Sequence, residues 1–235
     1  MEGACIFMEI AEMLDDLKKK ALEDPLLRQE LLDTRKTPTP VAAFCEKCRS
    51  CGEQHTITFD NIINDRGHPE LKEKVSSGEY FTWECPHCGA KNIIGGVPCL
   101  YHDSSEHLMV VLAGGVLKID DVPEGYTCRI VDSVGELIEK VKIFNAGLDD
   151  AVMELCKYIT CQELKKNVVL KFVKMDGADG EITFAYPQNG EMEMIVVGFN
   201  VYEDCAGIIS RNQDLQASAK SEKRIDRVWI SQHFA

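Results

Sequence analysis

Apolar positions near the N-terminus recur at helical spacing. The stripe consists of Ile10, Met13, Leu14, Leu17 and Ala21. Charged residues fill the opposite positions, which predicts a surface helix. Asp24 followed by Pro25 is typical of a helix start, so we expect a second, short helix there. Because Pro40 ends a proline-rich stretch, we predict a helical N-terminal arm over residues 1–40.

From residue 41 to residue 113 the pattern changes to short stretches divided by glycine and proline. Alternating or fully apolar stretches predict strands at 55–59, 80–84 and 108–112. Between the first two, residues 69–75 suit a short helix, and Gly78 stands where a helix C-terminus is usually released. Short strands dominate this region, and it contains one short helix.

Residues 114–235 combine helical and β patterns. Ser133 and Glu136 have the spacing of a capping box, which predicts a helix start, and 148–158 predicts another helix. Three β-rich segments, separated by Asp-Gly and Asn-Gly turns, predict an antiparallel meander. These segments are 168–173, 182–186 and 194–201. We expect the polar tail after Ser210 to be mobile or to pack only at its end.

The composition is that of a globular protein. The chain has 235 residues, of which 45% are hydrophobic, enough to bury a core. No apolar run approaches the ~20 residues needed to cross a bilayer, so we expect no membrane association. The first residues show no secretory signal, which predicts a cytoplasmic location. The net charge of -13 disfavours nucleic acid as a partner, because phosphate binding requires a basic surface. We therefore expect a protein partner.

The strongest motif in the chain is CxxCG, which occurs twice, with 33 residues between Cys51 of the first copy and Cys85 of the second. Two residues between thiolates let one tight turn direct both sulfurs at one ion, and the glycine tolerates the positive φ of such a turn. The predicted Zn²⁺ ligands are Cys48, Cys51, Cys85 and Cys88. Four protein thiolates close a tetrahedral zinc shell and leave no open position for catalysis. We therefore predict a structural site and no catalytic residue.

The remaining cysteines do not change this interpretation. The chain has eleven cysteines, and an odd number without an export signal favours metal ligation or free thiols over a disulfide framework. Cys45 forms a further CxxC with Cys48, but no glycine follows Cys48. We therefore pair Cys48 with Cys51 and leave Cys45 outside the predicted site.

Several segments resemble the CpXC domain, a bacterial and archaeal family named for its two cysteine motifs. The segments are CRSC at 48–51, PELKEK at 69–74, SGE at 77–79, CPHCG at 85–89 and LYHD at 100–103. Residues 137–144 and 147–150 are similar to the segment that commonly follows. Arg49 stands where the family name expects proline. Since proline only stiffens the turn, the resemblance still implies four metal ligands, and it implies no particular activity.

Two alternative functions remain open. CPHC at 85–88 is also the active-site tetrapeptide of strongly oxidising thiol–disulfide oxidoreductases, in which the first thiolate lies at a helix N-terminus. The glycines that follow disfavour a helix there by about 1 kcal/mol each, and this alternative leaves Cys48 and Cys51 without a role. The second alternative is a zinc ribbon that binds nucleic acid, which the net charge of -13 disfavours.

Other polar pairs have simple structural interpretations. The acidic pair at 149–150 follows Gly147, so we expect it to cap a helix, where negative charge is favourable. The His-Asp pair at 102–103 predicts a polar turn between two strands. Met192 and Met194 are expected to fill gaps in the core.

Together these patterns predict an α+β protein of three parts. They are a helical N-terminal arm (1–40), a CpXC zinc-ribbon-like domain of β-hairpins with a Cys₄ site (41–113), and a C-terminal region of helices and antiparallel strands with a polar tail (114–235). The predicted function is a zinc-binding, non-enzymatic one. We expect the structural ribbon to support a module that binds a protein or a small ligand.

Overall fold

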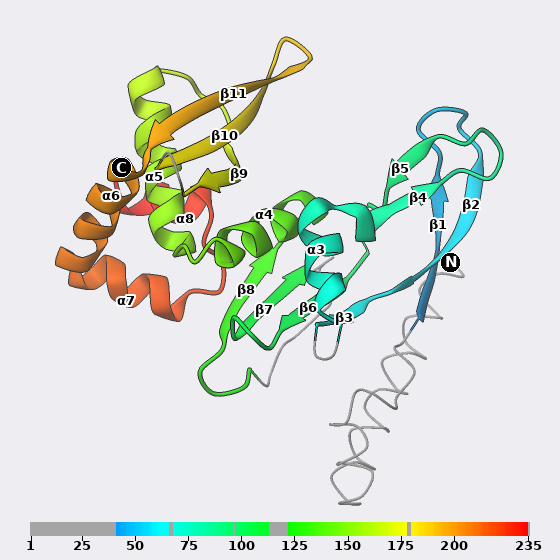
Figure 1. Ribbon diagram of the computed structural model, residues 1–235, viewed down its shortest axis with the longest axis horizontal. Helices are drawn as coiled ribbons and strands as arrows, with labels where there is room; N and C mark the ends of the chain where they lie inside the picture. The colour runs from blue at the N-terminus through cyan, green and yellow to red at the C-terminus, as the bar shows by residue number, and fades with distance from the viewer. Residues whose placement is uncertain (1–40, 66–67, 96, 113–121, 178–179, 235) are drawn as a thin grey trace, which may run out of the picture. The chain divides into compact units, whose positions relative to one another are not determined.

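The computed structural model describes residues 41–65, 68–95, 97–112, 122–177 and 180–234 (Figure 1). The predicted helical arm, residues 1–40, lies outside the described residues. From Val41 onward the chain forms one compact unit in which helices and strands are mixed, so the predicted α+β class is confirmed. No helix within the described residues is both long and apolar enough to cross a membrane.

Two antiparallel hairpins carry the cysteine motifs. The first pairs β1 (Val41–Lys47) with β2 (Gln54–Asp60), and the second pairs β4 (Thr82–Glu84) with β5 (Lys91–Ile93). The two hairpins lie side by side (Figure 1). The predicted strand 80–84 is shorter than expected, because Glu79–Phe81 forms a 3₁₀ turn before β4.

A four-stranded sheet follows the hairpins. It contains β3 (Ile62–Asn64), β6 (Cys99–Asp103), β7 (Leu108–Leu112) and β8 (Thr127–Val131), in the order β3-β6-β7-β8. All five residues of β7 are buried, as its apolar pattern predicts. Strand β8 follows residue 113 in the sequence and pairs with β7 in parallel.

Two helices accompany this sheet. Helix α3 (Pro69–Ser77) ends at Gly78, which has a φ of 83°, as the sequence predicts. Helix α4 (Val134–Asn145) begins after Ser133, whose side chain accepts the N–H of Glu136. Since α4 contacts α3, β7 and β9, its apolar stripe connects the sheet to the C-terminal part of the chain.

The C-terminal part contains the predicted meander. Strands β9 (Lys171–Asp176), β10 (Glu181–Gln188) and β11 (Glu191–Gly198) form an antiparallel sheet in the order β11-β10-β9. Four helices belong to the same part. They are α5 (Asp150–Leu164), α6 (Phe199–Arg211), α7 (Gln213–Ser221) and α8 (Arg227–His233).

The prediction for the polar tail was wrong. Residues after Ser210 form α7 and α8, and Leu215, Trp229 and Ile230 from this segment are buried in the same core as Phe184 of β10. Leu215 stands among polar neighbours, and Trp229 and Ile230 belong to a run of only three apolar residues, so a local count of hydrophobicity gives a weak signal over most of this segment. Two helices nevertheless bury them, because each helix needs only one narrow apolar face.

Two expectations for β11 were also wrong. The strand ends at Gly198 rather than at residue 201, and α6 begins there. Met192 and Met194 are 60% and 58% exposed instead of filling the core. Alternate residues of a strand face opposite sides. Ile195 faces the core side, so the methionines lie on the outer face.

Candidate metal centre

Each cysteine motif forms the turn of one hairpin. In the first turn, the N–H of Gly52 donates to the carbonyl oxygen of Cys48 (2.9 Å) and the N–H of Cys48 donates to the carbonyl oxygen of Glu53 (2.8 Å). The second turn repeats this pattern, and the N–H of Gly89 donates to the carbonyl oxygen of Cys85 (2.8 Å). Gly52 and Gly89 have φ values of 78° and 69°. A side chain would strain this left-handed backbone, which is why each motif has glycine here.

The two turns bring all four predicted sulfur ligands together. The Sγ atoms of Cys48, Cys51, Cys85 and Cys88 lie within 4.8 Å of one another. Cys48 Sγ is 3.7 Å from Cys88 Sγ, and Cys51 Sγ is 3.8 Å from Cys85 Sγ. A tetrahedral zinc ion with Zn–S bonds of ~2.3 Å sets sulfur–sulfur separations of about 3.8 Å. The cluster therefore fits one ion, and these residues can hold a metal.

The electrostatics of the cluster also favour a cation. The backbone N–H of Cys51 is the main cause that lowers the pKa of Cys48 to about 6, against the effect of burial. At Cys51 the N–H of Glu53 lowers the pKa, but desolvation and the neighbouring sulfurs outweigh it and raise the pKa to about 12. Four adjacent thiolates repel one another, so their joint ionisation requires a positive ion.

Asn92 is a polar residue in contact with the cluster that the sequence analysis missed. It lies in the middle of β5 and is 5% exposed. Its side-chain N–H group donates to Cys48 Sγ (3.5 Å) and to the carbonyl oxygen of Ala90 (2.9 Å), and its Oδ1 accepts the N–H of Arg49 (2.9 Å). Asn92 therefore joins the two turns. The available signal was an amide at an inward position of a strand that follows a CxxCG motif.

His55 supplies a second connection between the hairpins. Its Nε2 lies 3.3 Å from Cys85 Sγ, and its ring packs edge-on against Trp83 at 5.9 Å. His55 comes from β2, whereas Cys85 and Trp83 come from the other hairpin. A proton on Nε2 would be donated to the sulfur, which stabilises a thiolate at this position.

The structure keeps other candidates apart from the cluster. Cys45 is an exposed residue of β1, paired in register with Thr56, and does not belong to the four-sulfur cluster. The CPHC motif at 85–88 forms a hairpin turn between β4 and β5 and does not open a helix. The geometry required for an activated redox thiolate at a helix N-terminus is therefore not present at this motif.

Of the acidic pair at 149–150, only Asp149 has the capping role that the sequence predicted. Asp149 caps α5 and accepts the N–H groups of the first turn. Asp150 is buried and forms a two-point ion pair with Arg129 (2.8 and 2.9 Å) and a further pair with Lys140 (2.8 Å). Burial alone would raise the pKa of Asp150, but the two cations outweigh it and hold this pKa at about 2. Asp150 stands in the first turn of α5, as predicted, but its side chain pairs with cations distant in the sequence and does not cap the helix.

The expected polar turn at 102–103 also needs a correction. Both residues belong to β6, and the turn begins after them. Asp103 is fully buried, and its Oδ1 accepts the N–H groups of Ser105 and Glu106 (3.0 and 2.9 Å). Its Oδ2 accepts the hydroxyl of Tyr101 (3.0 Å) and lies 3.0 Å from Lys72 Nζ. Asp103 thus organises the β6–β7 turn.

The fold and the sulfur cluster define an α+β protein with a four-cysteine centre built from two hairpin turns. The model of the CpXC family, described as CpXC protein, matches residues 47–157. This segment, a little under half of the chain, is therefore similar to the CpXC family, in agreement with the resemblance seen in its motifs. No curated protein and no solved structure gives a significant match to the chain.

Proposed function

We propose that the four-cysteine cluster binds Zn²⁺ and that the bound ion has a structural role. The observation that carries this proposal is the pair of sulfur–sulfur separations, 3.7 and 3.8 Å, which fit the edges of a tetrahedral Zn–S₄ site. Four sulfurs from the protein would fill the shell, which is typical of structural zinc. Two of the four cysteines are 1% exposed, so one side of the site is shielded from water.

Zinc would supply folding free energy where the hairpins have little of their own. Strands β4 and β5 have three residues each, and an isolated two-stranded hairpin is at best marginally stable in water. Structural zinc contributes about 10–16 kcal/mol of apparent binding free energy in small zinc domains. Because Cys48 and Cys85 belong to the same buried cluster as Phe59 and Trp83, the ion would stabilise the packing of both hairpins.

The proposed task of the protein is binding, and the ribbon supports the binding module. A closed thiolate shell has no open position for a substrate, so a non-enzymatic role is the simpler hypothesis. The turn conformation at residues 85–88 supports zinc ligation over thiol–disulfide exchange. The net charge of -13 supports a protein or small-molecule partner over nucleic acid.

Metal analysis with matched cysteine variants tests the proposal. The purified chain should contain one zinc, and chelation should release four titratable thiols. Cys85→Ser should lose the zinc and lower the melting temperature. Cys45→Ser, which changes an exposed cysteine outside the cluster, should retain the zinc and the melting temperature. A chain without metal that carries a reducible disulfide between Cys85 and Cys88 would overturn the proposal and favour redox chemistry.

A further inference from the structure

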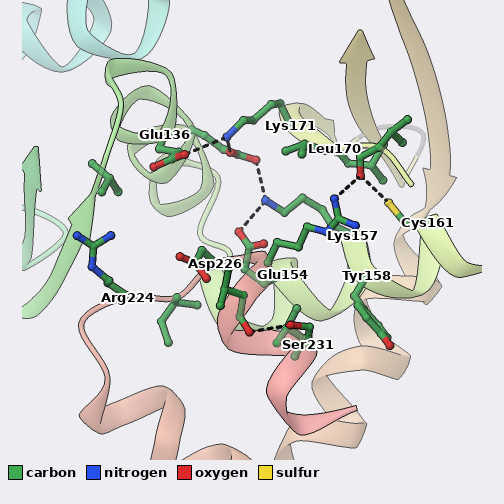
Figure 2. A pocket seen from close by; sticks show the side chains of 18 of the residues that line it. Glu136, Glu154, Lys157, Tyr158, Cys161, Leu170, Lys171, Arg224, Asp226 and Ser231 are labelled. Carbon is green, nitrogen blue, oxygen red and sulfur yellow. Dashed lines mark hydrogen bonds and ion pairs between the residues drawn. The ribbon is translucent and has the colours of Figure 1, made fainter. Parts of the chain in front are cut away.

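A second candidate site lies in the C-terminal part of the chain. A cavity of about 640 Å³ is lined by α4, α5 and α8, by the end of β8 and by the segment 165–171 (Figure 2). Its residues do not include the four-cysteine cluster. The volume is in the range of pockets that bind small organic molecules, about 300–1,000 Å³.

The floor of this cavity is a row of buried charges. Lys157 Nζ lies 3.0 Å from Glu139 and 2.6 Å from Glu154, and Lys140 Nζ lies 3.7 Å from the same Glu154 oxygen. Lys171 extends the row by pairing with the second oxygen of Glu139 (3.1 Å). Figure 2 shows Lys157 between Lys171 and Glu154. Four residues of the row are only 5–8% exposed: Glu139, Lys140, Glu154 and Lys157. Buried charges of this kind are costly to maintain, and they often mark functional sites.

Every carboxylate that lines the cavity already has a partner. The lining carboxylates are Asp132, Glu136, Glu139, Glu154 and Asp226. Two of them belong to the ion-paired floor. Asp132 pairs with Arg224 (2.6 Å), Glu136 accepts the N–H of Asp132 (2.9 Å), and Asp226 accepts the N–H of Trp229 (2.8 Å). The cavity therefore offers little unsatisfied negative charge to a cationic ligand.

Three cations that line the cavity form no ion pair within the described part of the chain. Lys166 Nζ contacts two neutral groups, the hydroxyl of Tyr186 and the side-chain oxygen of Gln188, both at 2.7 Å. Arg227 donates to the side-chain oxygen of Asn167 and to the carbonyl oxygen of Val168. Like Lys165, these two cations form no ion pair with a carboxylate among the described residues. Seven cations and five carboxylates line the cavity, so its net charge is positive, although the chain as a whole carries -13.

Apolar side chains complete the wall. They include Tyr158, Val168, Leu170, Val228 and Ile230. Figure 2 shows Tyr158 and Leu170 on the α5 side, with Arg224 across from them. In sites that orient a small organic molecule, apolar walls supply burial and charged groups fix direction.

We propose that this cavity binds a small organic anion. The carboxylate or phosphate group of the ligand pairs with Lys166 and Arg227, and its carbon skeleton packs against the wall formed by α5 and α8. The ion-paired floor excludes a second charge at depth, because its carboxylates and ammonium groups already neutralise one another. This inference does not depend on the metal site.

Calorimetric titration of the full zinc-loaded chain tests the proposal. The probes are succinate, glycerol 3-phosphate and inorganic phosphate, with succinamide as the neutral match for succinate. We expect at least one organic anion to bind saturably with a Kd of about 1 mM or lower, to weaken as salt is added, and to bind more tightly than inorganic phosphate. Succinamide should bind at least about tenfold more weakly than succinate wherever succinate binds.

Matched charge variants locate the binding. The double variant Lys166→Gln/Arg227→Gln should raise the Kd of the organic anion by about tenfold or more. Lys174→Gln/Arg211→Gln removes the same charge from exposed positions outside the cavity and should leave binding unchanged. The proposal is overturned if no organic anion binds, if both double variants bind alike, or if succinamide binds as well as succinate. Should the cavity variant not fold, the comparison of charged with neutral probes decides. An unchanged zinc content separates each of these outcomes from a failure of the metal site.

Discussion

The side-chain N–H of Asn92 lies 3.5 Å from the sulfur of Cys48. Asn92 comes from the second hairpin and Cys48 from the turn of the first. The same amide group also donates to the second turn and accepts from the first. One buried side chain therefore sets the position of the two hairpins relative to each other at the point where the sulfurs converge.

Asn92→Ala should weaken metal binding without removing any sulfur ligand. Loss of a hydrogen-bonding partner behind a metal ligand typically costs about 10–100-fold in metal affinity. We expect the zinc dissociation constant, measured by competition with a chromophoric chelator, to rise within this range. Asn145→Ala, at an exposed position of α4, is the control and should leave the constant unchanged. Equal constants for the two variants would contradict the role given to Asn92.

The adjacent carboxylates of Asp149 and Asp150 should differ in their effect on stability. Asp149→Ala removes a helix cap, which typically costs about 1 kcal/mol. Asp150→Ala leaves Arg129 and Lys140 buried without their shared partner, and breaking a buried pair in this way costs about 3–5 kcal/mol. Urea unfolding of the two variants measures the difference. Similar free energies of unfolding would show that Asp150 acts only as part of the helix start.

The ion pair of Lys72 with Asp103 predicts a dependence of stability on pH. Burial would raise the pKa of Asp103, but the N–H of Glu106, the hydroxyl of Ser105 and Lys72 outweigh it and hold this pKa at about 2. An unfolded aspartate has a pKa of about 3.9. The stabilisation that Asp103 provides is therefore fully present above about pH 4 and is lost as the pH falls toward 2.

Lys72→Met should raise the pKa of Asp103 and reduce this stabilisation. We expect the variant to be less stable than the parent protein near pH 6, and the difference to narrow at about pH 3, because Asp103 of the variant has the higher pKa and is protonated first. Urea unfolding at both pH values measures this difference in the free energy of unfolding. Lys74→Met, on the exposed side of the same helix, should change the free energy of unfolding much less than Lys72→Met at pH 6. A constant difference for Lys72→Met would rule out the ion pair as its cause.

Features that depend on neighbours in the sequence were predicted well. The turns at the two cysteine motifs, the left-handed Gly52 and Gly89, and the end of α3 at Gly78 all follow from a few consecutive residues. The three-stranded meander was predicted for the same reason, since its turns and its alternating strands are local patterns.

Features that depend on partners distant in the sequence were not predicted well. Asp150 was taken for a cap because its sequence neighbours suggest one, yet its partner Arg129 lies 21 residues away. Met194 was assigned to the core because methionine is apolar, but the packing of Ile195 decides which face of β11 is buried. The helices after Ser210 were missed because their few buried residues gain stability only from contacts with other elements.

The sequence by itself determined the two cysteine turns whose four sulfurs form the cluster, because spacing and glycine fix the conformation of each turn from within. Only the tertiary structure decided what surrounds them and what lies elsewhere: the amide of Asn92 behind Cys48, the buried ion pairs and the cavity between α5 and α8. These arise where segments far apart in the chain meet, and the free energy of such a contact depends on burial and geometry that no local pattern contains.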